Sequence, residues 1–451
     1  MADGGETVLQ RWLGRAVAVR PAEVRAALWS FAYFFCLLAG YYVLRPLRDE
    51  MGIAGGVRNL QWLFTATFVA MLAAVPVYGA VVARLPRRRF IPLVYHFFVI
   101  NIAIFWLLLA ADVGRVQVAR VFFVWISVFN LFAVSVFWSF MADMYDSEQG
   151  KRLFGFIAAG GSAGALVGPA VTVWLAKPLG PVNLLIVAAL LLEAAVLCAA
   201  RLERAAPRRA TVDAGPQAEP PPTDRDARKD GMGGGALSGI ALLLRSPYLA
   251  GIASWVFLLS LAGTFLYFQQ ANIVRAASDD PAVRTRIFAG IDLAVGILTV
   301  LVQCIATGRL IVRFGVGPAA AFLPLVFGIG FAVLAAAPAL LVVIGFQAIQ
   351  RTANFAISNP AREILFTVVD REEKYKAKNV VDTVVFRASD AVAGWLFATL
   401  RSAGLELTTI SLITVPLAAL WLALALALGR AQASRARDAA TVRSDRATAT
   451  G

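Results

Sequence analysis

Hydrophobic residues in this chain come in continuous blocks of about 20, separated by short polar segments. A helix of about 20 apolar residues crosses roughly 30 Å of hydrocarbon, and its backbone polar groups are bonded within the segment. The blocks are continuous rather than alternating, which favours helices over barrel strands. The sequence therefore predicts an all-α integral membrane protein of about twelve transmembrane helices. We place the spans at 26–44, 60–83, 90–110, 117–142, 153–176, 181–200, 247–270, 287–308, 317–337, 338–358, 380–400 and 407–429.

Composition and charge agree with a membrane protein. Of the 451 residues, 59% are hydrophobic and 16% charged, whereas soluble proteins average roughly 45–50% and roughly 25%. The net charge of +14 is unevenly placed: the even-numbered loops and both termini carry 30 of the 42 Lys and Arg, and the odd-numbered loops with their flanks carry 10. Basic loops stay in the cytoplasm. The charge thus predicts cytoplasmic termini in a bacterial inner membrane, and it is not a nucleic-acid signal.

One polar segment divides the chain. Residues 201–245 are rich in Pro and Gly, poor in large apolar residues, and predicted to be a disordered cytoplasmic linker. The predicted parts are an N-terminus (1–25), a six-helix bundle (26–200), the linker (201–245), a second six-helix bundle (246–430) and a tail (431–451). Two bundles of six helices resemble the major facilitator superfamily, whose transporters hold substrate near the membrane midplane between the halves. The loop after span two resembles that superfamily's signature in part: Gly79, Arg84 and Arg87–Arg89 match it, whereas Ala83 and Pro86 replace the usual acidic residue and second glycine.

Three segments resemble a narrower family, the transporters that exchange ATP for ADP. They are Tyr41-Tyr42-Val43-Leu44-Arg45-Pro46-Leu47-Arg48-Asp49-Glu50, then Phe137-Trp138 followed by Lys151-Arg152, and Lys376-Ala377-Lys378-Asn379-Val380-Val381-Asp382. Arg48 stands where that family has Lys, and Asp390 stands where another basic residue is expected. The resemblance implies an anionic, nucleotide-like substrate, with Arg45, Arg48 and Lys378 as binding residues and Asp49 and Asp382 as coupling or charge-pairing residues.

Polar side chains inside spans mark candidate sites, because an ionisable group in a membrane is costly and usually faces a water-filled path. In span ten, Gln347, Arg351, Asn354 and Ser358 share one helical face, and Arg351 can bind a phosphate through two oxygens. No acidic residue stands three or four positions from Arg351. The alternative role of Arg351 is a structural pair with a carboxylate from another helix.

Other charged residues in spans allow two interpretations. Asp292, on a polar stripe with Gly296, Thr299 and Gln303, is either a proton or counter-ion site or a structural pair. Arg387 and Asp390 are three residues apart, so they can pair on one face of span eleven. Glu193 either carries protons or extends to the interface.

Several residues are assigned to packing. Gly160, Gly164 and Gly168 give span five a smooth face for close helix contact. Cys36, Cys198, Cys304 and His96 are expected to be structural. No metal, cofactor or enzyme signature is found.

The sequence thus predicts a monomeric transporter of an organic phosphate or nucleotide-like anion, acting by exchange. The alternative is a proton-coupled exporter of amphipathic compounds that uses Asp292 or Glu193. A membrane enzyme is not favoured, because no catalytic signature is found, and a non-transporting scaffold is not favoured, because it would gain nothing from charges within the membrane.

Overall fold

The computed structural model describes residues 20, 23–84, 87–205 and 236–449. Within these ranges the elements are helices with no strand, so the all-α prediction is confirmed. Eleven helices of the described part are long and apolar enough to cross a membrane. They are Val24–Ala54, Val57–Val77, Ile91–Ala110, Arg115–Met144, Glu148–Leu175, Leu184–Ala205, Pro247–Ala277, Pro281–Phe314, Val316–Ala336, Leu340–Val368 and Leu407–Asp438.

The remaining predicted span, 380–400, is also helical. It is formed by η6 (Val381–Val385) and α17 (Phe386–Ser402). Asp382, Arg387 and Asp390 interrupt its apolar residues, which is why it is less hydrophobic than the other spans.

Helical structure extends beyond several of the predicted spans, because the helical backbone does not end where the apolar block ends. α2 (Val24–Ala54) runs past the predicted end at residue 44 and carries the charged segment in its last turns. α7 (Leu184–Ala205) and α9 (Ala236–Arg245) occupy the two ends of the predicted linker. α18 (Leu407–Ala449) continues through the predicted tail. Residues 206–235 of the linker lie outside the described residues.

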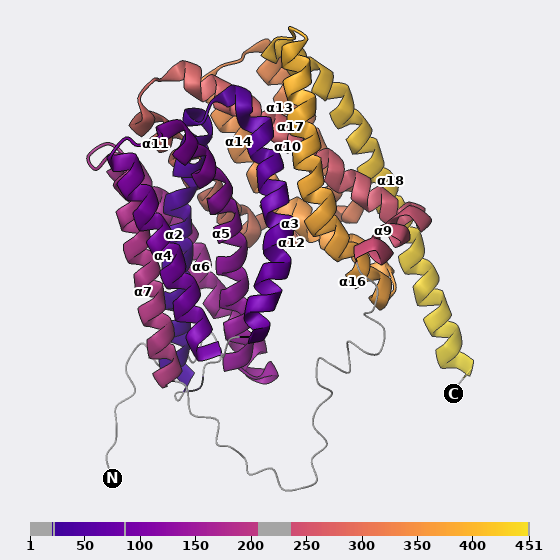
Figure 1. Cartoon of the computed structure of the whole chain (residues 1–451). Coiled ribbons are helices and arrows are strands. Elements are labelled where there is room, and N and C mark those ends of the chain that lie inside the picture. The colour runs from indigo at the N-terminus through magenta and orange to yellow at the C-terminus, as the bar shows by residue number, and fades with distance from the viewer. Residues whose placement is uncertain (1–19, 21–22, 85–86, 206–235, 450–451) are drawn as a thin grey trace, which may run out of the picture. The chain divides into compact units, whose positions relative to one another are not determined.

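The chain divides into two compact units. Unit 1 holds residues 1–209 with 274–296, and unit 2 holds 210–273 with 297–451. In unit 1, α2 packs most extensively against α5, α6 and α7, and α4 packs against α5 and α7 (Figure 1). The helices of this unit besides α2 and α7 are η2 (Val57–Asn59), α3 (Leu60–Arg84), α4 (Arg87–Ala110), α5 (Arg115–Met144) and α6 (Ser147–Leu175).

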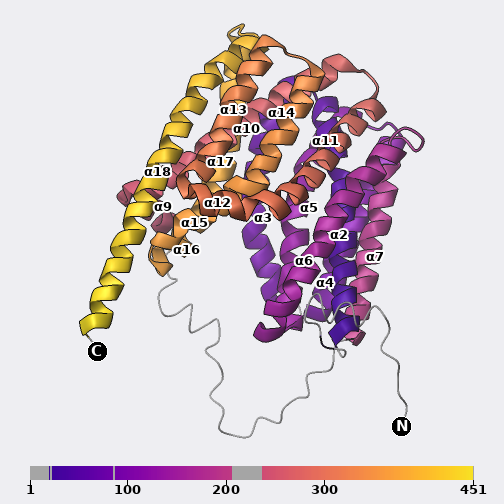
Figure 2. The ribbon, with the colours of Figure 1, turned by 180° about the vertical axis from the view of Figure 1, so that it is seen from behind.

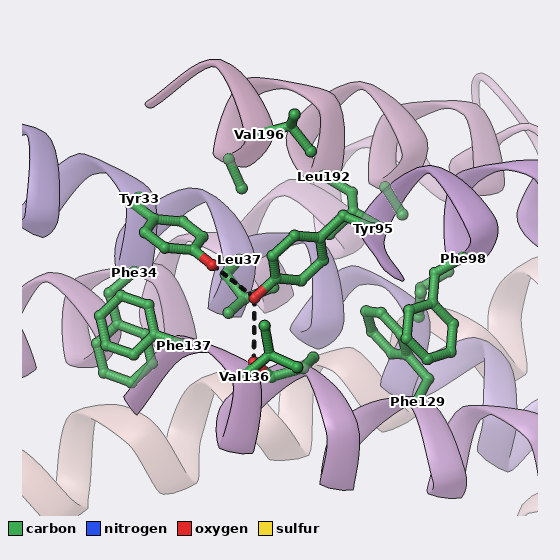
Figure 3. Packing of buried hydrophobic residues seen from close by; sticks show 14 of the residues in the cluster. Tyr33, Phe34, Leu37, Tyr95, Phe98, Phe129, Val136, Phe137, Leu192 and Val196 are labelled. Carbon is green, nitrogen blue, oxygen red and sulfur yellow. Dashed lines mark hydrogen bonds between the residues drawn. The ribbon is translucent and has the colours of Figure 1, made fainter. Parts of the chain in front are cut away.

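Aromatic side chains fill the core of unit 1 (Figure 3). The hydroxyl of Tyr33 donates to that of Tyr95 at 2.7 Å, and Tyr95 donates to the carbonyl of Ala133 at 3.2 Å. Each buried hydroxyl therefore has a partner, as the interior requires. Phe34 stacks on Phe137 with ring centroids 4.0 Å apart. This core ties together α2, α4 and α5.

The glycine face of α6 packs directly on the backbone of α2. A Cβ atom on Gly160, Gly164 or Gly168 would lie within 2.6 Å of a main-chain oxygen of α2. Such a distance is shorter than any ordinary contact, so only glycine fits at these three positions. The prediction that this run serves close helix packing is confirmed.

The first turn of α6 also fixes the start of α2. The carboxylate of Asp146 accepts from the Gln149 backbone at 2.7 Å, and the Gln149 side chain accepts from the Asp146 backbone at 3.1 Å, which makes a capping box. Glu23 then accepts two hydrogen bonds from the guanidinium of Arg152, at 3.0 and 3.1 Å. Although burial alone would raise the pKa of Glu23, the bonds from Arg152, Arg20 and Gln149 hold it below its ordinary value.

Unit 2 packs around α13 and α18, which lie side by side (Figure 2). The buried rings of Trp255, Phe327 and Trp421 meet in this unit, with centroids 5.5–5.6 Å apart. Its helices include α10 (Pro247–Ala277), α11 (Pro281–Val302), α12 (Gly308–Phe314), α13 (Val316–Ala336), α14 (Leu340–Ala353), α15 (Asn359–Leu365), η5 (Phe366–Val368) and α16 (Arg371–Val380). The last residues of α10, 274–277, and the first of α11, 281–296, belong to unit 1.

Two helical stretches of unit 2 contain wide turns that lie against each other. η3 (Gln303–Thr307) and η4 (Asn354–Ser358) are π-helical. Thr307 donates to the carbonyl of Ala356 at 2.8 Å, and Gln303 donates to that of Phe355 at 3.4 Å. A π turn weakens the regular backbone ladder, and here side chains bond two of its carbonyl oxygens.

Candidate substrate site

The charged turns at the end of α2 hold the first group of predicted residues. Arg45 donates to Asp292 of α11, with Nη1 and Oδ1 3.2 Å apart. The Asp292 side chain is only 2% exposed, whereas that of Arg45 is 21% exposed. A carboxylate buried this deeply needs a cation beside it. The geometry therefore gives Asp292 the role of counter-ion to Arg45.

Arg48 lies one turn further along α2, in a different environment. Its guanidinium stacks over the ring of Phe123 at 4.1 Å, and its Nη1 is 3.5 Å from Oδ1 of Asp49. A Cβ on Gly52 would lie 3.1 Å from the Phe123 ring, so the glycine leaves room for that ring. Arginine stacks on aromatic rings better than lysine does, which gives a physical reason for Arg at a position where the related family has Lys.

The strongest ion pair on α2 is one that the sequence analysis missed. Glu50 accepts from Nε and Nη2 of Arg284 at 2.7 and 2.6 Å, and both side chains are less than 10% exposed. Arg284 also donates to the carbonyl of Ser278 at 3.0 Å. Hydropathy predicts that Arg284 lies in a loop before the span at 287–308. In the structure, α11 begins at Pro281, so Arg284 lies in its first turn. The acidic Glu50 beside Asp49 was the available signal.

In unit 2, a chain of amide side chains surrounds the predicted residues of α14. Gln350 donates to Gln347 at 2.8 Å, and Gln347 donates to Gln270 of α10. All three are buried. Arg351 follows Gln350 directly and is half-buried, and Asn354, also half-buried, opens the π turn. Arg351 stands one turn after Gln347 on the same face of α14, so a guanidinium and an amide group that can both donate to an anion share this face.

Asp390 has further partners besides Arg387, the partner predicted from sequence spacing. Its Oδ2 lies 3.5 Å from Nη1 of Arg387, and its Oδ1 accepts from Ser260 and from Thr264, the latter at 3.2 Å. Both hydroxyls belong to α10, so Asp390 connects α17 to α10. Sequence spacing indicated only the bond within α17.

Lys378 and Asp382 each contact a residue of α15. Lys378 is 2.5 Å from Glu363, and Asp382 is 3.1 Å from Arg362. Lys378 is 30% exposed and Asp382 34% exposed. These two ion pairs join α16 and η6 to α15.

Comparison with known proteins identifies the family. A profile of the Major Facilitator Superfamily matches residues 26–369. The chain belongs to this superfamily. No curated protein sequence gives a significant match.

Solved structures of major facilitator transporters share the fold at low sequence identity. The nucleoside transporter NupG aligns with a TM-score of 0.59 and 14% identity, over 92% of this chain and 99% of its own. A bacterial homologue of the human lysosomal transporter Spinster gives 0.58 and 14%, over 92% and 99%. A bacterial homologue of the iron transporter ferroportin gives 0.60 and 12%, over 95% and 99%. At these identities the likeness concerns the fold alone.

In this major facilitator protein, the predicted residues fall into separate groups. Unit 1 brings together Arg45, Arg48, Asp49 and Asp292, and unit 2 brings together Gln347, Arg351 and Asn354 on one helix, with Arg387 and Asp390 on another. Glu193 lies 3.6 Å from His96 between α7 and α4, and neither side chain is buried. Among the described residues, no three His, Cys, Asp or Glu side chains are grouped to hold a metal ion.

Proposed function

We propose that this secondary transporter of the major facilitator superfamily carries an organic phosphate or nucleotide-like anion, exchanged by alternating access. We further propose that it works as a monomer in the bacterial inner membrane. The superfamily assignment supports a transporter rather than an enzyme. NupG is a nucleoside transporter and ferroportin an iron transporter, so the fold does not indicate one substrate class, and the proposed class rests on the residues of this chain.

The observation that carries the proposal is the position of Arg351. This guanidinium lies within an apolar helix, half-buried, next to a hydrogen-bonded chain of Gln347, Gln350 and Gln270. A permanently charged residue at this depth is costly and is typical of a substrate path. Its planar fork matches two oxygens of a phosphate or carboxylate. The amide chain fixes the surroundings, so an incoming anion meets donors that are already oriented.

Residues of unit 1 support the same substrate class. Arg45 and Arg48 stand on the segment that resembles the ATP/ADP exchangers, and both are about one-fifth exposed. Asp292 is bonded to Arg45, a placement that favours a counter-ion over the proton carrier of an amphipathic-compound exporter. Binding of an anion at Arg45 would then compete with Asp292, which couples occupancy of the site to an ion pair between α2 and α11.

Exchange can be measured in proteoliposomes. Vesicles preloaded with ADP or with phosphate should take up labelled ATP faster than empty vesicles. Arg351→Gln should reduce this uptake at least about tenfold, because a charge-assisted hydrogen bond of roughly 1.5–3 kcal/mol is lost. Arg309→Gln, an exposed arginine of the same unit, is the matched control and should transport normally. Equal uptake by loaded and empty vesicles, or uptake of lipophilic cations driven by protons, would contradict the proposal.

A further inference from the structure

A cavity at the end of unit 1 remote from Val24 lies among arginine side chains. It encloses about 360 Å³, within the range of cavities that hold small ligands. Its lining comes from the C-terminal end of α2 and the two glycines after it, from the start of α5, from the last turn of α10, from the segment between α10 and α11, and from the first turn of α11. The lining residues are Ile53, Ala54, Gly55, Gly56, Val116, Arg120, Arg275, Asp279 and Arg284. None of them belongs to the predicted substrate site.

The charges of this lining do not balance. Arg284 is neutralised by Glu50 in the bidentate pair described above. Arg120 and Arg275 remain, against the single carboxylate of Asp279. Among the described residues, no carboxylate lies within 4.0 Å of the guanidinium of Arg120 or of Arg275. The cavity therefore has a surplus of positive charge.

Backbone geometry holds Arg120 at the cavity wall. Its Nε donates to the carbonyl of Gly55 at 2.9 Å. A Cβ at Gly55 would lie 3.1 Å from Cγ of Arg120, so glycine is needed for this close approach. Gly56 has φ +99°, which few other residues adopt. Since only Nε is used in this bond, both terminal nitrogens of Arg120 remain to bind a ligand.

We propose that this cavity is a binding site for a phosphate-type oxyanion, held by the terminal nitrogens of Arg120 and by Arg275. Two arginine forks around a small cavity match the oxygens of a tetrahedral anion. The site is separate from Arg351, and the proposal stands whether or not the chain exchanges nucleotides. The ligand is either a free anion, such as a phosphate compound in solution, or the phosphate of a lipid headgroup, because the cavity lies where transmembrane helices end.

The test uses Arg275, because its side chain is exposed and holds no part of the fold together. Binding of labelled pyrophosphate to the purified full-length protein should be measured in a detergent free of phospholipid. Arg275→Gln should weaken binding at least about tenfold. Arg286→Gln is the control: this exposed arginine is two residues beyond Arg284 on α11 but does not line the cavity, so the change should leave binding within twofold. Equal affinity of the native protein, Arg275→Gln and Arg286→Gln for pyrophosphate would overturn the proposal. The proposal would also be overturned if the native protein neither bound pyrophosphate saturably nor retained phospholipid on purification.

Two further experiments distinguish a lipid headgroup from a free anion as the ligand, and this cavity from the site at Arg351. If the natural ligand is a lipid, phosphatidylglycerol should compete with pyrophosphate, and the native protein should retain more of this lipid on purification than Arg275→Gln does. If it is a free anion, phosphatidylglycerol should have no effect. In an Arg351→Gln background, pyrophosphate should still bind and Arg275→Gln should still abolish that binding. Failure of transport with binding intact would therefore contradict only the function proposed above.

Discussion

Glu50 and Arg284 share two hydrogen bonds of 2.7 and 2.6 Å, and both side chains are almost completely buried. The pair connects the end of α2 to the first turn of α11. Removing one partner of such a pair leaves a buried charge without compensation, which costs about 3–5 kcal/mol. Glu50→Gln should therefore lower the melting temperature of the purified protein strongly.

The control for this change is the exposed pair of Glu148 and Lys151, whose side chains are mostly in solvent. Glu148→Gln should have little effect, since exposed pairs contribute little. The double change Glu50→Leu with Arg284→Met should recover much of the lost stability, because apolar residues of similar size can replace a buried pair. A double variant no more stable than Glu50→Gln would show that the site needs its charges.

Gly164 and Gly155 lie on the same helix, α6, but in opposite surroundings. A Cβ at Gly164 would lie 2.4 Å from the carbonyl oxygen of Phe35, whereas a Cβ at Gly155 would meet nothing within 4 Å. Gly164→Ala should destabilise the protein by about 1–3 kcal/mol through overpacking. Gly155→Ala should leave stability unchanged or raise it by up to about 1 kcal/mol, because alanine favours helices. Equal melting temperatures for the two variants would contradict the observed contact of α6 with α2.

Glu23 makes stability depend on pH in a defined direction. Its pKa in the folded protein lies below the ordinary value of 4.5, since the bonds from Arg152, Arg20 and Gln149 outweigh the effect of burial. Its contribution is therefore fully present above about pH 4.5 and is lost as the pH falls through the lower, folded-state value. The melting-temperature difference between native protein and Glu23→Gln should be constant from pH 7 to 5 and shrink below it. A difference that grows on acidification would contradict this assignment.

Asp390 should matter more to stability than Arg387. Arg387→Gln removes one partner but leaves the bonds from Ser260 and Thr264, so we expect a loss of about 1 kcal/mol. Asp390→Asn weakens three interactions at once and should cost about 2–3 kcal/mol. The double variant Arg387→Gln with Asp390→Asn should be no more stable than Asp390→Asn, because the bonds of Asp390 to the two hydroxyls stay weakened. Thermal unfolding of the three variants measures this order.

The charge distribution predicts where the termini lie. Reporter fusions at Gly234 and Gly451 should both give cytoplasmic signals, because basic residues are concentrated in the termini and the even-numbered loops. A fusion in the predicted odd-numbered loop near Asp279 should give the opposite signal. A periplasmic reading at Gly451 would overturn both the orientation and the even number of spans.

Much of the fold follows from apolar block length, because a membrane leaves the backbone few other choices. The exceptions have local causes. α2 continues through Arg45–Glu50 because those charges find partners on α11 and on Phe123, which a hydropathy window does not include. The span at 380–400 was predicted from its apolar residues, although Asp382, Arg387 and Asp390 interrupt them.

The candidate site was less accessible to sequence reasoning. Spacing identified the polar face of α14 and the pairing distance of Arg387 and Asp390, since both are properties of one helix. Partners on other helices, such as Arg284 for Glu50 or Gln270 for Gln347, depend on tertiary packing and carry no periodic signal.

The paired wide turns η3 and η4 have a consequence for how this chain tolerates insertion and deletion. A π turn contains one residue more than the α-helical turn it replaces, and each residue of an α-helix turns the chain by about 100°. Deleting one residue from Asn354–Ser358 would restore a regular helix and leave the residues beyond it close to their present orientation, because the wide turn absorbs the extra residue. The carbonyls that Gln303 and Thr307 now bond would return to the helix ladder at the same time. The extra residue of η4 thus leaves carbonyl oxygens available to side chains of η3, and a deletion there should remove these two bonds rather than change the orientation of α15.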